Sequence, residues 1–163
     1  MAELWDAYDR DFNKIEGVTL TRGEPFAEGV YHLCCEIIVK HTDGTYLLMQ
    51  RDLRKPFGGM WEITAGGCAQ MGEDPLSAAI RELKEETGVD AENIKEIKRI
   101  FTESEHSHTY QYLCITDCPK DSVTLQEGET IAYRWVKRDT VLKIADKEIS
   151  SLKLLATFKE LDT

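Results

Sequence analysis

The sequence has no long apolar run and no excess of basic residues, and these two absences exclude different classes of protein. No stretch approaches the roughly 20 apolar residues of a membrane-spanning helix, and the N-terminal MAELWDAYDR resembles neither a secretion signal nor a transit peptide. We therefore expect a cytoplasmic protein without a membrane partner. With 20 Lys and Arg against 30 Asp and Glu, the chain has too little basic surface to bind a nucleic-acid polymer.

Paired cysteines, repeats and linkers are also missing. The five cysteines are an odd set without the paired spacing of metal ligands, apart from a loose C-x3-C at Cys114 and Cys118. We expect most of the five to be buried free thiols in a reducing compartment. Without repeats, low-complexity tracts or a linker, residues 1–163 are predicted to form a single domain.

Short stretches rich in β-forming residues predict eight strands. They cover Leu4 to Tyr8, Gly17 to Thr21, Tyr31 to Lys40, Tyr46 to Gln50, Trp61 to Ala65, Ile94 to Glu103, Thr109 to Thr116 and Ile131 to Val136. Asp43 and Gly44 mark a tight turn between the third and the fourth of these. Helical apolar spacing predicts two closing helices, at Asp139 to Ala145 and Ser150 to Leu161. Mixed strands and helices indicate an α/β fold.

A further helix is predicted within GCAQMGEDPLSAAIRELKEETGV, at residues 67–89. Asp74 is a favoured N-cap, Pro75 suits the first helical position, and Gly88 suits a left-handed C-terminal cap. The local chemistry therefore predicts a helix from Pro75 to Thr87.

This helix carries two distinct faces. At about 100° of rotation per residue, one apolar face is expected to point to the core, and it comprises Leu76, Ala79, Ile80, Leu83 and Thr87. Glu82, Glu85 and Glu86 gather on another face, where they repel one another by about a few tenths of a kcal/mol per pair. Oxygen ligands of this kind suit Mg²⁺ in a cleft. The alternative is an ordinary solvated acidic face.

Fixed spacing over the whole segment decides between these alternatives. The residues concerned are Gly67, Glu73, Arg81, Glu82, Leu83, Glu85, Glu86, Gly88 and Val89. Seven fixed residue types at such spacing arise by chance at about 10⁻⁹ to 10⁻⁸ per start position. The segment resembles, without a departure, the box that defines the Nudix hydrolases, G-x5-E-x7-R-E-U-x-E-E-x-G-U with U aliphatic.

The resemblance implies an α/β (α+β) Nudix fold, in which a curved mixed β-sheet is sandwiched between helices and carries a catalytic loop-helix-loop. It also implies hydrolysis of the diphosphate bond in a small nucleoside diphosphate linked to a group X, or in another organic diphosphate. Mg²⁺ or Mn²⁺ would be the cofactor. On this basis the strands within residues 1–28 are an extension of the Nudix domain.

Residue roles follow from the same resemblance. Glu82, Glu85, Glu86 and the backbone carbonyl of Gly66 are the expected metal ligands. Glu85, Glu86 or a glutamate from a later loop would help to deprotonate the attacking water.

Other positions of the box would act indirectly. The resemblance implies that Glu73 and Arg81 orient the catalytic cluster.

Further candidates lie outside the box. Glu127, in Q-E-G-E-T before the last predicted strand, is the candidate for another catalytic carboxylate, with Glu129 also available. An ordinary acidic turn is the alternative. Arg51, Arg54 and Lys55 are candidates for binding substrate phosphates, because such cations pair with phosphate oxygens. Solvated loop cations are the alternative here.

A second resemblance points to one branch of the superfamily. The runs W-D-A-Y-D at 5–9 and G-G-M-W-E-I-T-A-G-G at 58–67 are similar to isopentenyl-diphosphate isomerase and its hydrolase-like relatives. The isomerase, which is the alternative function, needs a catalytic cysteine where this chain has Gly66 and a metal-binding histidine where it has Cys68. The missing thiol favours hydrolysis.

Two more hypotheses stay open. A Nudix module that senses a nucleotide without turnover would not need the intact carboxylate set. A second metal site could be formed by His32, Glu103, Glu105 and Cys68, because imidazole, carboxylate and thiolate together suit Zn²⁺ or Mn²⁺. The alternative makes His32 a strand residue at the edge of the cleft and residues 103–108 a polar, solvated loop.

The box does not name the group X. The extra motifs of the ADP-ribose and NADH subclasses are missing after Val89, which leaves nucleoside diphosphate derivatives, prenyl diphosphates and thiamine-type diphosphates as candidates. Many family members are homodimers, and the N-terminal strands between Leu4 and Thr21 are available as a surface for a partner subunit.

Overall fold

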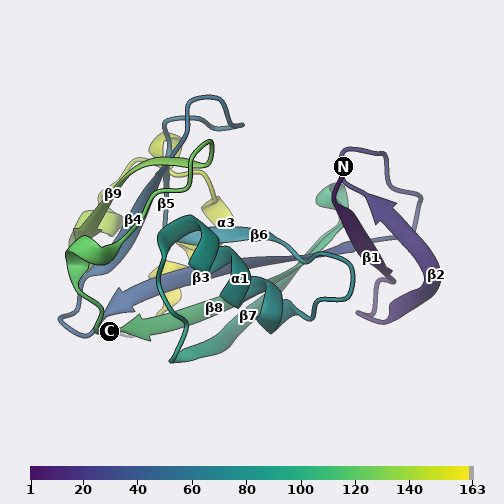
Figure 1. Ribbon diagram of the computed structural model, residues 1–163, viewed down its shortest axis with the longest axis horizontal. Coiled ribbons are helices and arrows are strands. Elements are labelled where there is room, and N and C mark those ends of the chain that lie inside the picture. Colours follow the sequence, from purple (N-terminus) through teal and green to yellow (C-terminus); the bar gives the residue numbers. More distant parts are fainter. Residues whose placement is uncertain (162–163) are drawn as a thin grey trace.

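A computed structural model describes residues 1–161, with α1 in front of the sheet and α3 behind it (Figure 1). The strands are β1 (Leu4–Tyr8), β2 (Lys14–Thr21), β3 (His32–His41), β4 (Tyr46–Arg51), β5 (Trp61–Glu62), β6 (Ala65–Cys68), β7 (Ile94–Thr102), β8 (Ser107–Thr116) and β9 (Thr130–Val136). The α-helices are α1 (Pro75–Thr87), α2 (Arg138–Leu142) and α3 (Leu152–Glu160), and short 3-10 turns cover Glu103–Glu105, Lys120–Ser122 and Asp146–Glu148. None of the described helices is long and apolar enough to cross a membrane.

The main sheet is mixed and has seven strands. Its path is β5-β4-β3-β8-β7, with β6 paired to β3 and β9 paired to β4. The central strands β3 and β8 run parallel, in register from His32 beside Ser107 to His41 beside Thr116, while the other pairs are antiparallel. β1 and β2 form a separate antiparallel sheet, which joins the rest of the molecule through a bridge between Tyr8 and Tyr31.

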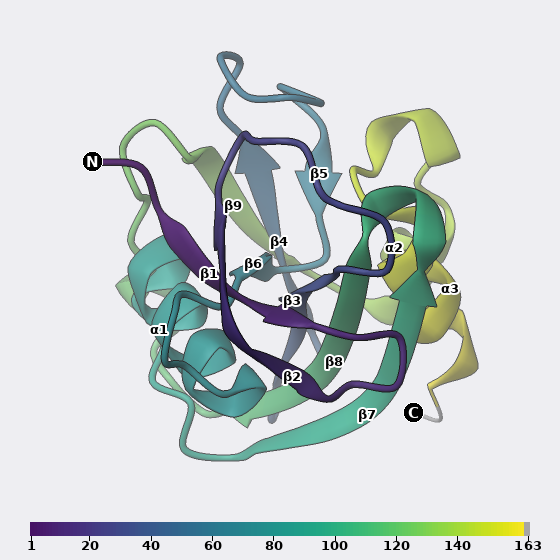
Figure 2. The same cartoon turned by 90° about the vertical axis from the view of Figure 1, so that its right-hand side faces the viewer.

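Helices cover both faces of the main sheet, and Figure 2 shows α1 on one side of it and α2 and α3 on the other. On the first side Ala79 and Leu83 enter a core with the inward residues of β3, β4 and β8. On the second side Val141, Leu155 and Phe158 enter another core. Burial on both faces accounts for the nearly continuous apolar character of the central strands. The predicted sandwich of helices around a mixed sheet is confirmed.

The limits of α1 match the predicted caps. The Asp74 side chain accepts a hydrogen bond from the backbone N–H of Ser77 at 2.7 Å, which supplies a partner for an otherwise unpaired amide of the first turn. Gly88 takes a left-handed φ of 75°, and its N–H donates to the carbonyl of Lys84. The helix therefore runs from Pro75 to Thr87, as predicted.

The prediction of its buried face was partly wrong. Leu76 and Ile80 are 44% and 40% exposed, whereas Ala78, which was not assigned to the core, is fully buried. Two alanines side by side let the helix axis approach β3 and β6 closely, and the larger side chains are left at the margins of the contact. The buried face of the helix therefore includes Glu86, which is only 5% exposed.

The strand expected over Trp61 to Ala65 is broken in two. Thr64 has a φ of 79°, which is strained for a β-branched residue. Its hydroxyl accepts from the N–H of Val39 at 3.0 Å and donates to the carbonyl of Leu47 at 2.8 Å, so it replaces the missing sheet contacts. The turn moves the chain from a place beside β4 to a place beside β3, where the catalytic box begins.

The alternative of a polar, solvated loop over residues 103–108 is right only for residues 103–105, which are exposed. The segment contains a 3-10 turn and the start of β8, and His108 is fully buried. The Nε2 atom of His108 lies 2.8 Å from the carbonyl oxygen of Asp9, and its ring lies 3.7 Å from that of Phe12. His108 therefore fastens the turn between β1 and β2 to the main sheet.

Candidate functional site

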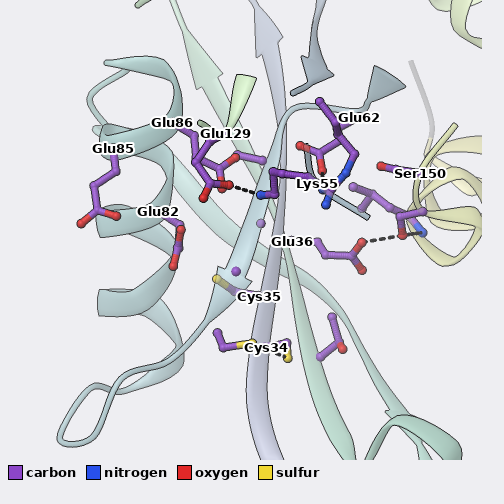
Figure 3. Close-up of a pocket in the computed structure, with 18 of the residues that line it drawn as sticks. Cys34, Cys35, Glu36, Lys55, Glu62, Glu82, Glu85, Glu86, Glu129 and Ser150 are labelled. Atoms are coloured by element: carbon purple, nitrogen blue, oxygen red, sulfur yellow. Dashed lines mark hydrogen bonds and ion pairs between the residues drawn. The ribbon is translucent and has the colours of Figure 1, made fainter. Parts of the chain in front are cut away.

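A cleft of about 710 Å³ lies between α1, the strands β3 and β6, and the loops around Lys55 and Glu129. This volume suits a small molecule. Figure 3 shows glutamates entering the cleft from both the helix and the strands. Eight glutamates line it: Glu3, Glu36, Glu62, Glu82, Glu85, Glu86, Glu105 and Glu129. Only five lysines and arginines do so, namely Arg22, Arg51, Lys55, Arg81 and Lys153, so the cleft has an excess of negative charge.

Gly67 allows the helix to bring Glu82 against β6. A Cβ atom at residue 67 would lie 2.3 Å from the carboxyl carbon of Glu82, which is far inside van der Waals contact. The absence of a side chain therefore makes room for a carboxylate. Gly66 has a similar restriction, because its Cβ would lie 2.8 Å from the carbonyl oxygen of Cys35.

Arg81 connects the two ends of the box. Its guanidinium donates to both carboxylate oxygens of Glu73, at 2.6 and 3.0 Å, and to the carbonyl of Cys68 at 3.1 Å. Its Nη1 atom also lies 2.9 Å from Glu82 and 3.2 Å from Glu85. The hydrogen bond with Glu73 is the largest of the effects that raise the pKa of Arg81 above its ordinary value. One side chain thus fixes the loop before the helix and two of the helix carboxylates.

Three carboxylates in the cleft are strongly desolvated. Burial raises the pKa of Glu82 to about 7, against an ordinary value of 4.5, although Arg81 opposes the shift. Burial also raises the pKa of Glu86 well above its ordinary value, and the nearby Glu62 and Glu82 add to the effect. Burial raises the pKa of Glu62 as well. Buried like charges of this kind indicate a site built for a cation.

The donors fit a hard divalent cation. Glu82, Glu85, Glu86 and the Gly66 carbonyl all lie on the cleft and all offer oxygen, which Mg²⁺ and Mn²⁺ prefer. The oxygens of the three carboxylates are not all within 4.8 Å of one another, whereas ligands of one Mg²⁺ lie at most about 4.2 Å apart. Side-chain rotation would therefore accompany binding of one ion by all three.

Comparison with known proteins agrees with the box and its geometry. The model of the NUDIX domain family matches residues 30–158. The chain belongs to the Nudix family. A Nudix hydrolase of Listeria monocytogenes is 27% identical over 138 residues, which are 84% of this chain and 81% of that protein. The Nudix hydrolase YfcD of Salmonella typhi is 30% identical over 140 residues, 83% of this chain and 74% of that protein. The predicted class of enzyme, a Nudix hydrolase, is confirmed.

Solved structures show the same fold. A crystal structure from Deinococcus radiodurans has a TM-score of 0.78 at 17% identity and covers 97% of this chain and 98% of that one. The NUDIX domain of Shewanella oneidensis NrtR, solved in complex with ADP ribose, has a TM-score of 0.64 at 20% identity and covers 85% and 93%. The fold is therefore shared with the first structure over nearly the whole chain and with a NUDIX domain over 85% of it.

Two of the three expected phosphate-binding cations reach the Nudix cleft. Arg51 forms an ion pair with Glu62, and Lys55 forms one with Glu129. Arg54 instead turns outward to Asp52, and its side chain is 71% exposed. Local geometry explains the difference, because the Asp52 carboxylate accepts from both the backbone and the side chain of Arg54.

The two candidate glutamates before β9 are separated in the same way. Glu127 is exposed and lies outside the residues that line the cleft, although it was the preferred candidate. Glu129 lines the cleft and meets Lys55, as Figure 3 shows. The turn at Gly128, with a φ of 81°, directs one glutamate outward and the other inward.

Glu36 and Glu62 were missed from the sequence. Glu62 follows Trp61 within a run that was used only for the resemblance. Glu36 accepts from Ser151 at 2.6 Å and from Gln111 at 3.1 Å, and so links β3 to the start of α3. Both glutamates come from strands outside the box, and only the sheet register brings them to the cleft.

The hypothesis of a second metal site needs a different set of residues. Glu103 pairs with Arg10 and accepts from the Tyr31 hydroxyl, while Glu105 pairs with Lys153. These contacts occupy both carboxylates.

Cys34, which was not a candidate ligand from the sequence, lies where Glu103 and Glu105 were expected. Cys34 lies beside Cys68 and His32, and its Sγ atom is 3.2 Å from that of Cys68. All five cysteines are free, but only Cys35 and Cys114 are buried, so the expectation that most would be buried was wrong.

Proposed function

We propose that this Nudix hydrolase cleaves the diphosphate bond of a small organic diphosphate, with a nucleoside diphosphate linked to a group X as the first class to test. The cofactor would be Mg²⁺ or Mn²⁺, held by Glu82, Glu85, Glu86 and the carbonyl of Gly66. Bound there, the ion would screen the phosphate oxygens and acidify a water molecule.

The side chains of the cleft then have separable tasks. A carboxylate oxygen of Glu85 or Glu86 would accept the proton of the water whose oxygen attacks phosphorus, as the bond from phosphorus to the bridging oxygen breaks. Arg81, positioned by Glu73, would keep the helix carboxylates in place. Glu129 replaces Glu127 as the candidate for an additional catalytic carboxylate.

The cations of the cleft would hold the substrate phosphates. Arg51 and Lys55 both line the cleft and are the two that we assign to this task. Arg54 is not assigned to it, because its guanidinium is bound to Asp52 and it is not among the residues that line the cleft.

One observation carries the proposal. A cleft of small-molecule size holds buried carboxylates around Glu82 and Glu86 that no cation of the chain fully neutralises. A diphosphate brings more negative charge, so it can bind there only together with a divalent cation. This is the combination that the diphosphate hydrolysis of the Nudix family requires.

The test is a screen of diphosphate compounds with the purified protein in Mg²⁺ or Mn²⁺, with products identified by mass spectrometry. The set should include ADP-ribose, because the related NrtR domain was solved with that compound. Glu85→Gln and Glu86→Gln keep the size of the side chain and remove its charge. We expect turnover of at least one compound and a large loss in both variants. Tight binding without turnover, or turnover that both variants retain, would refute the proposal.

The isomerase alternative is not favoured. Residue 66, where the isomerase would need its cysteine, is a glycine with a backbone carbonyl only 2.8 Å from the position of a Cβ. A side chain there would require the backbone of β3 to move. Formation of dimethylallyl diphosphate from isopentenyl diphosphate in the same screen would restore this alternative.

We also propose that residues 1–163 act as one Nudix unit, with residues 1–28 as an extension. Support comes from the bridge between Tyr8 and Tyr31 and from stacking of Trp5 on His32 at 4.4 Å. The outer strand β2 is largely exposed, which leaves the expected surface for a homodimer available.

A further inference from the structure

Two thiols and an imidazole meet at one end of the cleft. Cys34 on β3 and Cys68 on β6 face each other in the antiparallel register, and His32 lies two residues before Cys34 on the same strand. Figure 3 shows the Cys34 sulfur below Cys35 and farther from the α1 glutamates. We call these three residues, His32, Cys34 and Cys68, the thiol corner.

The ligand atoms of the thiol corner are already gathered. One atom from each of the three residues lies within 4.8 Å of the other two, and this is the only such set among the described histidines, cysteines and acidic residues. The two sulfurs are 3.2 Å apart, much longer than the 2.05 Å of a disulfide. Two sulfurs bound to one tetrahedral Zn²⁺ would be about 3.8 Å apart, so only a small adjustment separates this arrangement from a metal site.

His32 has no other polar partner. Within residues 1–161, its ring nitrogens approach only sulfur, with the Cys34 Sγ atom at 3.8 and 3.7 Å. The ring is nearly buried and is held between Trp5, at 4.4 Å, and Phe26, at 5.0 Å between ring centroids. A buried imidazole usually donates to or accepts from oxygen or nitrogen. Here the ring is held between aromatic side chains, and one of its nitrogens can serve as a ligand beside the thiols.

We propose that the thiol corner is a binding site for Zn²⁺ or another thiophilic divalent cation, separate from the Mg²⁺ or Mn²⁺ site of the box. Thiolate and imidazole select such an ion over Mg²⁺, which prefers oxygen. The separation by ligand chemistry lets two different metals occupy one cleft. The proposal does not depend on the hydrolytic activity.

The geometry also indicates an open coordination position. Cys34 and Cys68 line the cleft, whereas His32 is buried and is not among the residues that line it. Glu105, one of the acidic residues that the sequence suggested as a ligand here, is held by Lys153 at 2.7 Å. Three protein ligands and one position open to a cleft are the pattern of zinc sites that bind an exchangeable ligand, rather than of closed structural sites.

The experiment uses the full chain, reduced and stripped of metal, in excess Mg²⁺ so that the box is occupied. Addition of Co²⁺ as a spectroscopic substitute for Zn²⁺ should produce thiolate charge-transfer absorption that saturates at one equivalent. Zn²⁺ should then abolish the signal, and native mass spectrometry should show one Zn²⁺ per chain. Cys34→Ser and Cys68→Ser should each weaken Co²⁺ binding by more than about 100-fold, since even outer-shell changes cost 10- to 100-fold.

Cys118→Ser is the matched control, because Cys118 is also half-buried but lies far along the chain from the thiol corner. It should leave the cobalt spectrum unchanged. Alkylation of the wild-type protein does not depend on the folding of any variant. Zn²⁺ should protect Cys34 and Cys68, but not Cys118, from iodoacetamide. Peptide mass spectrometry would measure the alkylation of each cysteine.

Several results would overturn the proposal. They are a cobalt spectrum without thiolate absorption, equal alkylation of Cys34 and Cys68 with and without Zn²⁺, or an equal loss of binding in Cys118→Ser. None of these readouts uses turnover. The thiol corner can therefore be refuted while the proposed hydrolase function stands, and the reverse is also true.

Discussion

The carboxylate of Glu82 occupies the space that a side chain at residue 67 would fill. The carboxyl carbon lies 2.3 Å from the position of a Cβ on Gly67. The first residue of the box and its first helix carboxylate are therefore complementary in shape, although fourteen residues of chain lie between them.

Gly67→Ala should displace Glu82 and lower both metal affinity and turnover by about 10- to 100-fold, as for other changes that misplace a metal ligand. Isothermal titration with Mn²⁺ and steady-state kinetics would measure the two effects. Gly72→Ala is the control. A side chain at residue 72 is strained by the left-handed φ of 87°, but no atom lies within 4 Å of the position of its Cβ. That control should reduce stability and leave metal binding intact. Equal metal affinity in both variants would argue against the role of Gly67.

Arg81→Lys should lower turnover by about 10- to 100-fold. A lysine has one ammonium group and cannot pair with Glu73 in a two-pronged manner while also reaching Glu82 and Cys68. The loss should appear mainly in kcat, since Arg81 is a positioning residue. Lys84→Gln, on the exposed side of the same helix, should have no effect. Wild-type kinetics in Arg81→Lys would show that the arginine network is dispensable.

Glu129→Gln should reduce turnover more than Glu127→Gln. Only Glu129 lines the cleft and meets Lys55, whereas Glu127 projects into solvent. Steady-state kinetics of the two variants with one substrate would compare them directly. The order would be reversed if the loop carboxylate that acts in the reaction were Glu127.

The stability of the metal-free protein should fall as pH rises from about 4.5 to 7. In the folded chain Glu82 keeps its proton up to a pKa of about 7, whereas in the unfolded chain it loses the proton near 4.5. The folded state therefore binds more protons in this window, and the free energy of unfolding decreases by about 3 kcal/mol on account of this group. Glu86, with its raised pKa, acts in the same direction.

Urea denaturation in EDTA at several pH values would measure this effect. Glu82→Gln should flatten the dependence, because the amide does not titrate. Mn²⁺ at pH 7.5 should restore stability to the wild type by binding the folded state. Parallel curves for the wild type and Glu82→Gln would assign the pH dependence to other groups.

Asp74→Ala should destabilise the protein by about 1 kcal/mol, through loss of the N-cap bond to Ser77. Asp74→Ser, which can accept the same bond, should recover most of this loss. Denaturation midpoints in saturating Mg²⁺ would compare the three proteins. Equal destabilisation by both substitutions would indicate a role for the Asp74 charge rather than for the cap.

Local rules predicted the features that depend on neighbouring residues. The limits of α1 follow from Asp74, Pro75 and Gly88, and the structure has them as expected. The positions of Glu82, Glu85 and Glu86 on the cleft follow from helical spacing, once the box identifies the helix.

Features that depend on distant parts of the chain were not predictable in this way. Thr64 breaks a strand because β3 and β4 both need a partner there, and no property of Thr64 itself signals this. Cys34 and Cys68 meet because β3 pairs with β6 in one particular register. Glu127 was preferred over Glu129 because the direction of each side chain depends on the turn at Gly128.

Every lysine and arginine that lines the cleft is held by a glutamate. Arg51 with Glu62 and Lys55 with Glu129 are the two pairs nearest the box. An arriving phosphate can take the cation of such a pair only if the released carboxylate gains another partner, and a divalent ion supplies one. Binding of either ligand thus lowers the free-energy cost of separating these ion pairs when the other ligand binds. The metal should therefore raise the affinity for diphosphate, and the diphosphate should raise the affinity for metal by the same factor.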